Sequence, residues 1–412
     1  MSDIKPFKCI RPAADKVQDV AALPYDVYSR GEAAEAVKGK PLSFLNIDRP
    51  ETQFGPDFDM YSDAAYDKAR ELLDKEIADG TFICDNDEAY YIYELIMDGR
   101  SQTGIVACAS IDDYLNNKIK KHEKTRADKE QDRINHVDRT SAQTGPIFLA
   151  YRSEEAINEI VNKHKQETPI YAFTSEDGIT HNVWKIVGSD VSALREAFDE
   201  VNSIYIADGH HRCASAVKVG LKRREEHPDY DGTEEFNYFL SVLFPDDQLM
   251  IMPYNRVVKD LNGMTKEEYL EALDKYFDVE EKGRKAFYPE EKGSYGMYLD
   301  GTWYLVTARD TIRSDDPVDG LDVSILQDYL LTPLLDIEDP RIDKRIGFVG
   351  GIRGLEELER RADSDMKLAF SMYPTSIDEL FEVADADMLM PPKSTWFEPK
   401  LRSGIFIHRI EE

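Results

Sequence analysis

The sequence predicts an α/β protein of mixed α+β type, because strand-like runs alternate with helix-prone stretches along all 412 residues. A chain of this length exceeds one ordinary hydrophobic core, and its 42% apolar fraction is enough to fold two or three domains. We expect an α/β module over residues 1–115, a central core over 116–260 and an α+β module over 261–412.

Turn residues and hydrophobic periodicity place the individual elements. Residues 90–111 and residues 296–308 each predict a β-hairpin, since an Asp-Gly pair separates two strand-like runs. Residues 345–361 predict a strand, a turn and a helix. Further strands are expected at 145–151, 181–187, 204–207, 236–244 and 249–258, and further helices at 61–79, 154–165, 191–200, 213–227 and 323–335.

Composition excludes several classes of protein. The 51 Lys and Arg against 81 Asp and Glu give a net charge of −30, which repels nucleic acids and anionic membranes. No stretch approaches the roughly 18 consecutive apolar residues of a membrane span. The four cysteines are far apart and form no C-x-x-C pair, which fits a reducing cytoplasm. We therefore expect a cytoplasmic protein whose partners are neither nucleic acids nor membranes.

Three segments run against the acidic average and indicate an anionic ligand. Residues 118–139 hold eight basic and five acidic residues, whereas 341–353 and 391–409 each hold four basic residues and one acidic residue, so each segment carries +3. A continuous helix over 118–139 would place five basic side chains on one face, a stripe suited to phosphate, although a solvated helix of alternating charge explains it equally well. Those five residues are His122, Arg126, Lys129, Arg133 and His136.

The second and third basic segments contain turns that suit an anion. Gly350 and Gly351 separate an apolar strand from a helix, where backbone N–H groups attract anions, although an ordinary turn is an equal reading. Lys393-Ser394-Thr395 lies in a proline-stiffened loop and does not match a P-loop. The candidate phosphate or substrate contacts in these segments are Arg345, Gly350, Gly351, Arg353, Lys393, Ser394 and Thr395.

The stretch YIADGHHRCASAVKV, residues 205–219, runs from a strand through a tight turn into a helix. Gly209 permits the reversal, and the helix start presents unpaired N–H donors above the strand end. Two other readings stay open at this point. Asp208, His210 and His211 supply metal-ligand types, and Asp208 is also a suitable helix cap beside surface histidines.

The same stretch resembles the Asp-Gly-x-His-Arg signature of the fold shared by ParB nucleotide-binding domains, sulfiredoxin and free L-serine kinases. The order of the upstream motifs agrees with the kinases, since His122-Glu123 and then TGPIFLAY (144–151) precede Asp208. The separation of 208 − 123 = 85 residues exceeds what such a core needs, so residues 173–187 are expected to be an insertion.

Over nearly its whole length the chain resembles the family called domain of unknown function 1015. The matching blocks include IKPFKCIRP, LPYDVYS, KKHEKTRADKEQDR, IADGHHR, YNRVVKDLNG, DKRIGFVGGIRG and MPPKSTWFEPKLRSG. This resemblance implies no activity, so the functional expectation comes from the kinase-like core.

The resemblance to the kinases implies a role for each residue of the core. Glu123 would accept the proton of a seryl hydroxyl, unless it only pairs with Arg126, and Asp208 would orient that group or bind Mg²⁺. The expected phosphate contacts are Gly209, His210, His211, Arg212, Arg126 and Lys129, although His210 replaces a smaller residue and has no assigned role.

These roles describe a small-molecule phosphotransferase that acts on free serine or phosphoserine with ATP or ADP and Mg²⁺. Its direction of reaction and its oligomeric state stay open. Two other classes share the same residues: a non-catalytic nucleotide sensor of ParB-like type, and a phosphoserine phosphohydrolase.

Overall fold

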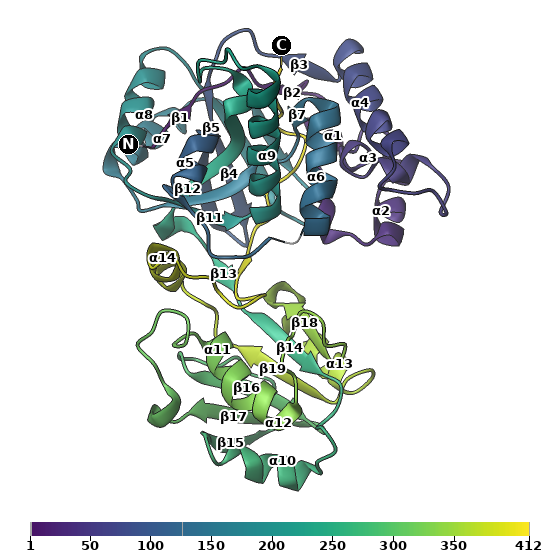
Figure 1. Cartoon of the computed structure of the whole chain (residues 1–412), viewed down its shortest axis with the longest axis vertical. Coiled ribbons are helices and arrows are strands. Elements are labelled where there is room, and N and C mark those ends of the chain that lie inside the picture. Colours follow the sequence, from purple (N-terminus) through teal and green to yellow (C-terminus); the bar gives the residue numbers. More distant parts are fainter. Residues whose placement is uncertain (1, 126, 412) are drawn as a thin grey trace. The chain divides into compact units, whose positions relative to one another are not determined.

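Two compact units form the chain in the computed structural model, which describes residues 2–125 and 127–411. Unit 1 combines Met1–Leu249 with Pro399–Glu412, and unit 2 is Met250–Glu398. Helices and sheets are mixed within each unit, which confirms the predicted α/β class (Figure 1). No helix of the described residues is long and apolar enough to cross a membrane.

Unit 1 is built on a mixed sheet that has nine strands within the described residues, in the order β6-β11-β8-β12-β5-β4-β10-β9, with β1 beside β5. The pairs β6–β11 and β8–β12 are parallel, and the others described are antiparallel. The strands are β1 (Ile4–Lys5), β4 (Tyr90–Met97), β5 (Arg100–Ser110), β6 (Ile119–Lys120), β8 (Ile147–Tyr151), β9 (Tyr171–Thr174), β10 (Thr180–Ile186), β11 (Ile204–Asp208) and β12 (Tyr238–Pro245).

Pairing within this sheet crosses the module boundaries that the sequence indicated. Strands β4 and β5 form the predicted hairpin, with Asp98 and Gly99 at φ 52° and 79° in its turn. Strand β5 also pairs with β12, so residues on both sides of the expected boundary at 115 share one core. The β9–β10 pair, expected as an insertion, joins the same sheet through β4. The second unit starts at residue 250.

The helices of unit 1 pack into several hydrophobic clusters. Helices α7, α8 and α9 bury apolar side chains against the large sheet, and α3 and α4 pack around Phe44 and Leu73. The helices are α1 (Val17–Val20), α2 (Arg30–Ala36), α3 (Leu45–Asp48), α4 (Asp63–Ala78), α5 (Ile111–Leu115), α6 (Ala127–Thr140), α7 (Glu155–His164), α8 (Ser189–Asp199) and α9 (His210–Glu226).

Helices α6 and α9 lie side by side and run in the same direction (Figure 1). Near their starts, Ser215 Oγ donates to the carbonyl oxygen of Glu130 at 3.0 Å. Further along, Lys222 Nζ pairs with Asp138 at 2.6 Å. The early residues of α6 thus contact the early residues of α9, and the later residues of α6 contact the later residues of α9. The N-termini of the two helices therefore lie at the same end of unit 1.

The C-terminal segment 399–412 crosses unit 1 and joins several of its loops. Ile407 forms a bridge to Ile10, and Ser403 forms one to Ala22. Gly404 has φ 84°, and a Cβ atom built on it would lie 2.4 Å from Cγ of Phe44. The short strands in this part are β2 (Ile10–Pro12), β3 (Phe82–Cys84), β7 (Ala142–Gln143) and β21 (His408–Arg409).

Gly404→Ala is therefore expected to lower the free energy of unfolding by about 2–4 kcal/mol, since a left-handed backbone and overpacking against Phe44 both add cost. Chemical denaturation of the two proteins measures the difference. Gly99→Ala is the matched control, because Gly99 has φ 79° but no atom within 4 Å of its added Cβ. That variant should lose only about 1 kcal/mol. Equal losses in the two variants would contradict the packing argument.

Unit 2 contains an antiparallel sheet of six strands within the described residues, in the order β15-β17-β16-β19-β14-β18. It confirms the predicted hairpin at 296–308 and the strand, turn and helix at 345–361. Its elements are β13 (Ile251–Met252), β14 (Tyr254–Val258), α10 (Lys266–Leu273), β15 (Phe277–Gly283), β16 (Ser294–Leu299), β17 (Thr302–Ala308), α11 (Asp322–Leu326), α12 (Thr332–Leu335), β18 (Ile346–Gly350), η7 (Gly351–Arg353), α13 (Gly354–Ala362), β19 (Leu368–Met372), α14 (Ile377–Asp385) and β20 (Trp396–Phe397).

Candidate functional site

The turn at Asp208-Gly209 joins β11 to α9 in unit 1. The first four residues of β11 are buried, and the strand ends at the half-exposed Asp208. Gly209 follows with φ 94°, a left-handed conformation that glycine adopts without strain. Helix α9 then begins at His210, so the backbone N–H groups of its first turn lie beside the end of the strand.

Asp208 is held in its ionised form by cations. Lys400 Nζ lies 2.8 Å from Asp208 Oδ2, although the two residues are 192 positions apart. Burial by itself raises the pKa of Asp208, but Lys400 and Arg212 outweigh it and hold that pKa well below its usual range. Sequence reasoning counted Lys400 in a basic segment without giving it a role, because nothing local in the chain connects it to the turn.

Arg212 fixes the turn to the start of β8. Its Nη1 donates to the carbonyl oxygen of Pro146 at 3.0 Å. A Cβ atom added to Gly145 would lie 3.3 Å from Arg212 Nη1 and 3.0 Å from Ser403 Oγ. The motifs at 144–151 and 205–219, which the sequence placed in one site, therefore meet here, and the C-terminal segment joins them.

His210, which had no role at the sequence level, connects the turn to the loop that carries Glu123. The rings of His122 and His210 meet edge to face with centroids 4.5 Å apart. The backbone N–H of His122 donates to His210 Nε2 at 3.5 Å, so the proton of a neutral His210 sits on Nδ1. That Nδ1 lies 3.9 Å from Glu123 Oε2. His210 thus presents an N–H toward the candidate base.

Both histidines are buried and neutral at pH 7. Burial lowers the pKa of His122 to about 4 and lowers the pKa of His210 well below its usual range. The described residues contain no group of three or more His, Cys, Asp or Glu side chains arranged to hold a metal ion. The paired histidines therefore connect the turn to the loop that carries Glu123.

The buried His122 makes stability depend on pH. Because its folded-state pKa is depressed, the unfolded chain binds more protons below about pH 6.5, and stability falls as pH drops from there toward 4. The free energy of unfolding that is lost between pH 7 and pH 5 should be smaller in His122→Phe than in the wild type by about 1–2 kcal/mol. Urea denaturation at both pH values measures it. The exposed control His227→Phe should keep the wild-type dependence, and an unchanged dependence in His122→Phe would refute the assignment.

The continuous helix over 118–139, on which the stripe of five basic residues depended, is wrong. Ile119 and Lys120 form β6, which pairs with β11, so His122 and Glu123 lie in a loop before α6. Arg126 lies outside the described residues. On α6 the side chain of Lys129 is exposed, whereas Arg133 and His136 are buried, yet Lys129 and Arg133 line one cavity of unit 1 and Arg133 and His136 line another.

Two helix starts and several cations make this end of unit 1 suitable for an anion. Helices α6 and α9 begin there side by side, and each directs the positive end of its dipole to this end. His211 and Arg212 are the second and third residues of α9 and are half-buried. Lys400 and Arg212 place two positive charges beside Asp208 at the same turn.

A magnesium ion bound by Asp208 does not fit this arrangement. The carboxylate already accepts from Lys400, and Arg212 and the start of α9 add positive charge around it. Mg²⁺ commonly reaches such sites through the phosphates of its substrate, with few protein ligands. Asp208 is accordingly assigned here to the positioning of Lys400.

The candidate residues on β18 and η7 of unit 2 are engaged in packing. The N–H of Gly351 donates to the carbonyl oxygen of Pro253 at 2.8 Å, so it is not open to an anion. A Cβ atom on Gly350 would lie 2.9 Å from the ring of Trp396, which explains the glycine by close packing. Arg345 Nη2 pairs with Asp343 at 2.8 Å, and Arg353 is exposed.

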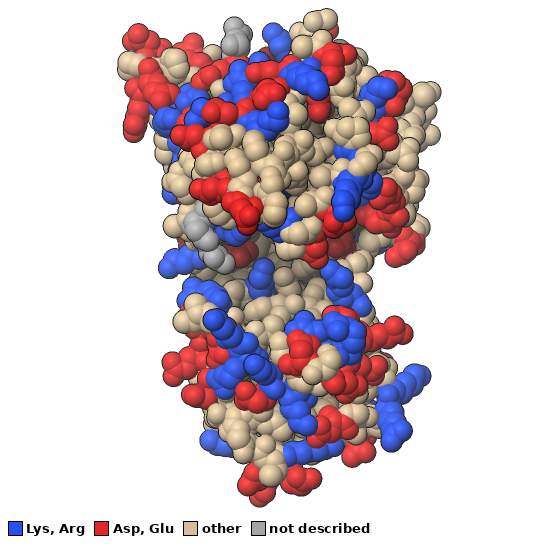
Figure 2. All heavy atoms as spheres, turned by 90° about the vertical axis from the view of Figure 1, so that its right-hand side faces the viewer, with Lys and Arg blue, Asp and Glu red and all other residues tan. Residues whose placement is uncertain are grey.

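The third basic segment places Lys393 on the surface of unit 2, with its Nζ 5.4 Å from the centroid of the Tyr254 ring. Ser394 Oγ donates to the carbonyl oxygen of Pro391 at 2.6 Å, and Thr395 is half-buried. On the face shown in Figure 2, basic side chains lie among acidic ones. The expectation that the three basic segments share one ligand stays a prediction.

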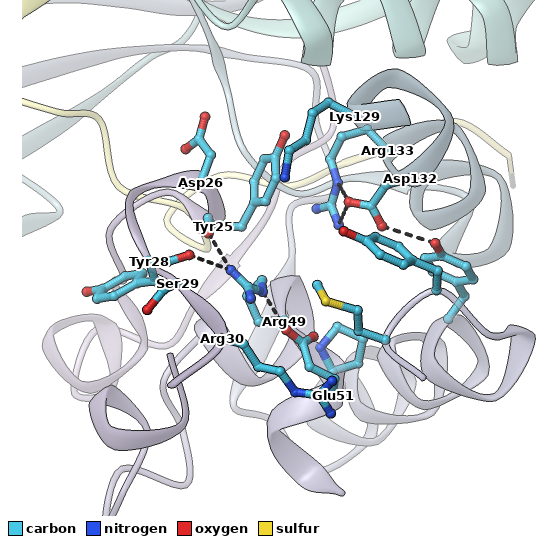
Figure 3. Close-up of a pocket in the computed structure, with 14 residues that line it drawn as sticks. Tyr25, Asp26, Tyr28, Ser29, Arg30, Arg49, Glu51, Lys129, Asp132 and Arg133 are labelled. Atoms are coloured by element: carbon cyan, nitrogen blue, oxygen red, sulfur yellow. Dashed lines mark hydrogen bonds and ion pairs between the residues drawn. The ribbon is translucent and has the colours of Figure 1, made fainter. Parts of the chain in front are cut away.

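Unit 1 also contains a cavity that sequence reasoning missed. It has a volume of about 240 Å³, and its walls include Tyr25, Arg49 and Arg133 (Figure 3). A second, smaller cavity of about 30 Å³ shares Tyr25 and Arg133 and is also lined by Arg212. Lys129 and Arg133 of the predicted basic stripe are among its lining residues, as are residues of the block LPYDVYS (23–29), but nothing in the sequence connects the two segments.

Solved structures similar to the chain share little sequence with it. A free serine kinase in complex with AMP is 13% identical, with a TM-score of 0.36, over 71% of this chain and 86% of that one. SbnI with a C-terminal truncation, from Staphylococcus aureus, is 11% identical, with a TM-score of 0.37, over 71% and 82%. A conserved hypothetical protein from Pyrococcus furiosus is 15% identical, with a TM-score of 0.35, over 74% and 94%. Matches at this level assign no activity to the chain.

No curated protein matches the sequence significantly. A family model described as "Protein of unknown function (DUF1015)" matches residues 4–324. This range covers most of the 412 residues and confirms the resemblance for the blocks inside it, whereas DKRIGFVGGIRG (343–354) and MPPKSTWFEPKLRSG (390–404) lie beyond it. The chain therefore belongs to the DUF1015 family.

Proposed function

We propose that the protein is a small-molecule phosphotransferase that transfers a phosphoryl group between ATP or ADP and a hydroxy amino acid, with free serine or phosphoserine as the preferred substrate. One observation carries the proposal: His210 lies 3.9 Å from the carboxylate of Glu123 and begins the same helix that presents Arg212. A carboxylate and a turn that carries a cation at a helix start therefore lie in the same unit, which supports the proposal, because phosphoryl transfer needs a base and positive charge at the phosphates.

In the direction of phosphoserine formation, the hydroxyl group of serine receives the phosphoryl group of the nucleotide. The hydroxyl oxygen attacks the terminal phosphorus while its proton passes to Glu123, and the bond from that phosphorus to the bridging oxygen breaks, which leaves the shortened nucleotide. Arg212 and the N–H groups of α9 stabilise the charge on the phosphate oxygens. Lys400, whose Nζ lies 2.8 Å from Asp208 Oδ2, adds a positive charge at the same turn. The reverse reaction uses the same groups.

Phosphorus NMR of the protein with Mg²⁺, L-serine and either ATP or ADP tests the proposal. A phosphoserine resonance that grows with time is the expected result. If no phosphoserine forms or is consumed with any of several nucleotides, the proposal fails. Nucleotide binding without turnover would instead identify a sensor, and phosphate release from phosphoserine without nucleotide would identify a phosphohydrolase.

A further inference from the structure

The cavity of about 240 Å³ in unit 1 has no part in the proposed transfer step, although Lys129, an expected phosphate contact, is one of the residues that line it (Figure 3). It lies among η1 (Tyr25–Val27), η2 (Pro50–Gln53), α4 and α6. Pockets for drug-sized ligands have volumes of roughly 300–1,000 Å³, so this smaller space suits a small metabolite.

Two buried ion pairs form part of its wall. Arg49 Nε lies 2.6 Å from Glu51 Oε1, and Arg133 Nη2 lies 2.9 Å from Asp132 Oδ2. All four residues are at least nine-tenths buried. Arg49 Nη1 also donates to the carbonyl oxygens of Tyr25 and Tyr28, both at 2.9 Å, which fixes its position. Buried charges of this kind are costly to keep unless they are held rigidly.

Each guanidinium keeps one nitrogen available to a ligand. Among the described residues, Arg49 Nη2 and Arg133 Nη1 have no recorded acceptor. Arg133 lies over the ring of Tyr25 at 3.9 Å, so its plane is fixed as well. Figure 3 shows both side chains directed into the space that the labelled residues surround. Guanidinium groups held in place are the donors best suited to bind a carboxylate.

The rest of the wall suits the remainder of an amino acid. Asp26 lies at the edge of the cavity with its carboxylate directed away from it in Figure 3, so an ammonium group has room to remain at the open side. Tyrosine rings close the sides and leave little room for a large side chain. The smaller cavity lined by Tyr25 and Arg133 is also lined by Arg212, which places the site one side chain away from the proposed phosphate turn.

We propose that this cavity is the acceptor site, in which Arg49 and Arg133 bind the carboxylate of a small hydroxy amino acid. The assignment rests on the proposed function and gives its acceptor a place. The amino acid enters next to Arg212 with its carboxylate directed away from the phosphate, so that its hydroxyl faces the turn.

A paired substitution tests the site without leaving a buried charge alone. Asp132→Asn with Arg133→Gln removes both charges, and an amide oxygen can still accept from Tyr66, whose OH lies 3.0 Å from Asp132 Oδ1. The KM for L-serine should rise about 10–100-fold, because hydrogen bonds to a charged group are lost. The KM for nucleotide should change less than about twofold. The control Arg139→Gln lies on α6 and loses only exposed pairs, so it should change neither constant.

A second variant fills the cavity and leaves both ion pairs intact. Met60 lines the space and is half-buried, so Met60→Trp should raise the KM for L-serine in the same selective way. Thermal unfolding of each variant establishes that it is folded. An unchanged KM for L-serine in both folded variants would overturn the assignment, even if turnover persists and the proposed function stands.

Calorimetric titration separates this assignment from the proposed function. L-serine, L-phosphoserine and inorganic phosphate are titrated into the wild-type chain and both variants. One outcome is that no turnover is found, L-serine binds, and the variants weaken its binding about 10–100-fold. The carboxylate site is then supported, whereas the proposed phosphotransferase activity is not. If inorganic phosphate displaces L-serine from the cavity and the variants weaken phosphate equally, the cavity recognises phosphate and the acceptor assignment is overturned.

Discussion

Glu123→Gln is expected to lower the rate of phosphoryl transfer by about 10²–10⁴-fold, because an amide cannot accept the hydroxyl proton. The substitution keeps the shape of the side chain and leaves Arg212 and the start of α9 in place. Nucleotide affinity should therefore change less than about twofold. Initial rates from phosphorus NMR and nucleotide titration by calorimetry measure the two quantities.

Glu225→Gln is the matched control for this experiment. Glu225 is an exposed carboxylate on α9, the helix that starts at the turn, so its loss should leave both rate and affinity unchanged. A Glu123→Gln variant that keeps more than half of the wild-type rate would contradict the role of Glu123 as the base.

Lys400→Met is expected to weaken nucleotide binding by about 10–100-fold, since it removes a cation and leaves the Asp208 carboxylate to repel phosphate. Stability should also fall by about 1–3 kcal/mol. This is less than for a fully buried pair, because about a third of the Asp208 side chain is exposed. Nucleotide titration and chemical denaturation at pH 7 measure the two losses.

The pH dependence of this loss has a definite sign. Lys400 depresses the pKa of Asp208, so the stabilisation is complete above the ordinary carboxyl pKa of about 4 and is lost as the pH falls further. The difference in stability between wild type and Lys400→Met should therefore shrink below pH 4.

Two further variants are controls for this loss of stability. Adding Asp208→Asn to Lys400→Met should restore most of the stability at pH 7, whereas Lys163→Met, which breaks an exposed pair, should cost little stability. A Lys400→Met variant as stable as the wild type at pH 7 would show that the pair is not stabilising.

Local patterns predicted those parts of the fold that depend on neighbouring residues. The two Asp-Gly hairpins and the strand before Gly209 are where the sequence placed them, because turn chemistry and apolar runs act over a few residues. The start of α9 was also predictable, since a glycine with positive φ must separate it from β11.

Contacts between distant segments were not predictable in the same way. The helix expected over 118–139 starts only at Ala127, because Ile119 and Lys120 pair with a strand 85 residues further on. The partner of Asp208 is Lys400, and the cavity beside Arg212 is formed by side chains from four separate segments. Such contacts depend on tertiary packing, which overrides local preference and leaves no periodic trace in one sequence.

The most direct test of the proposed site is a crystal structure of the protein soaked with a non-hydrolysable ATP analogue and Mg²⁺. We expect phosphate density within hydrogen-bond distance of Arg212 and of the first N–H groups of α9, with Glu123 facing the terminal phosphate. A nucleotide bound elsewhere, with the Asp208–Arg212 turn empty, would contradict it.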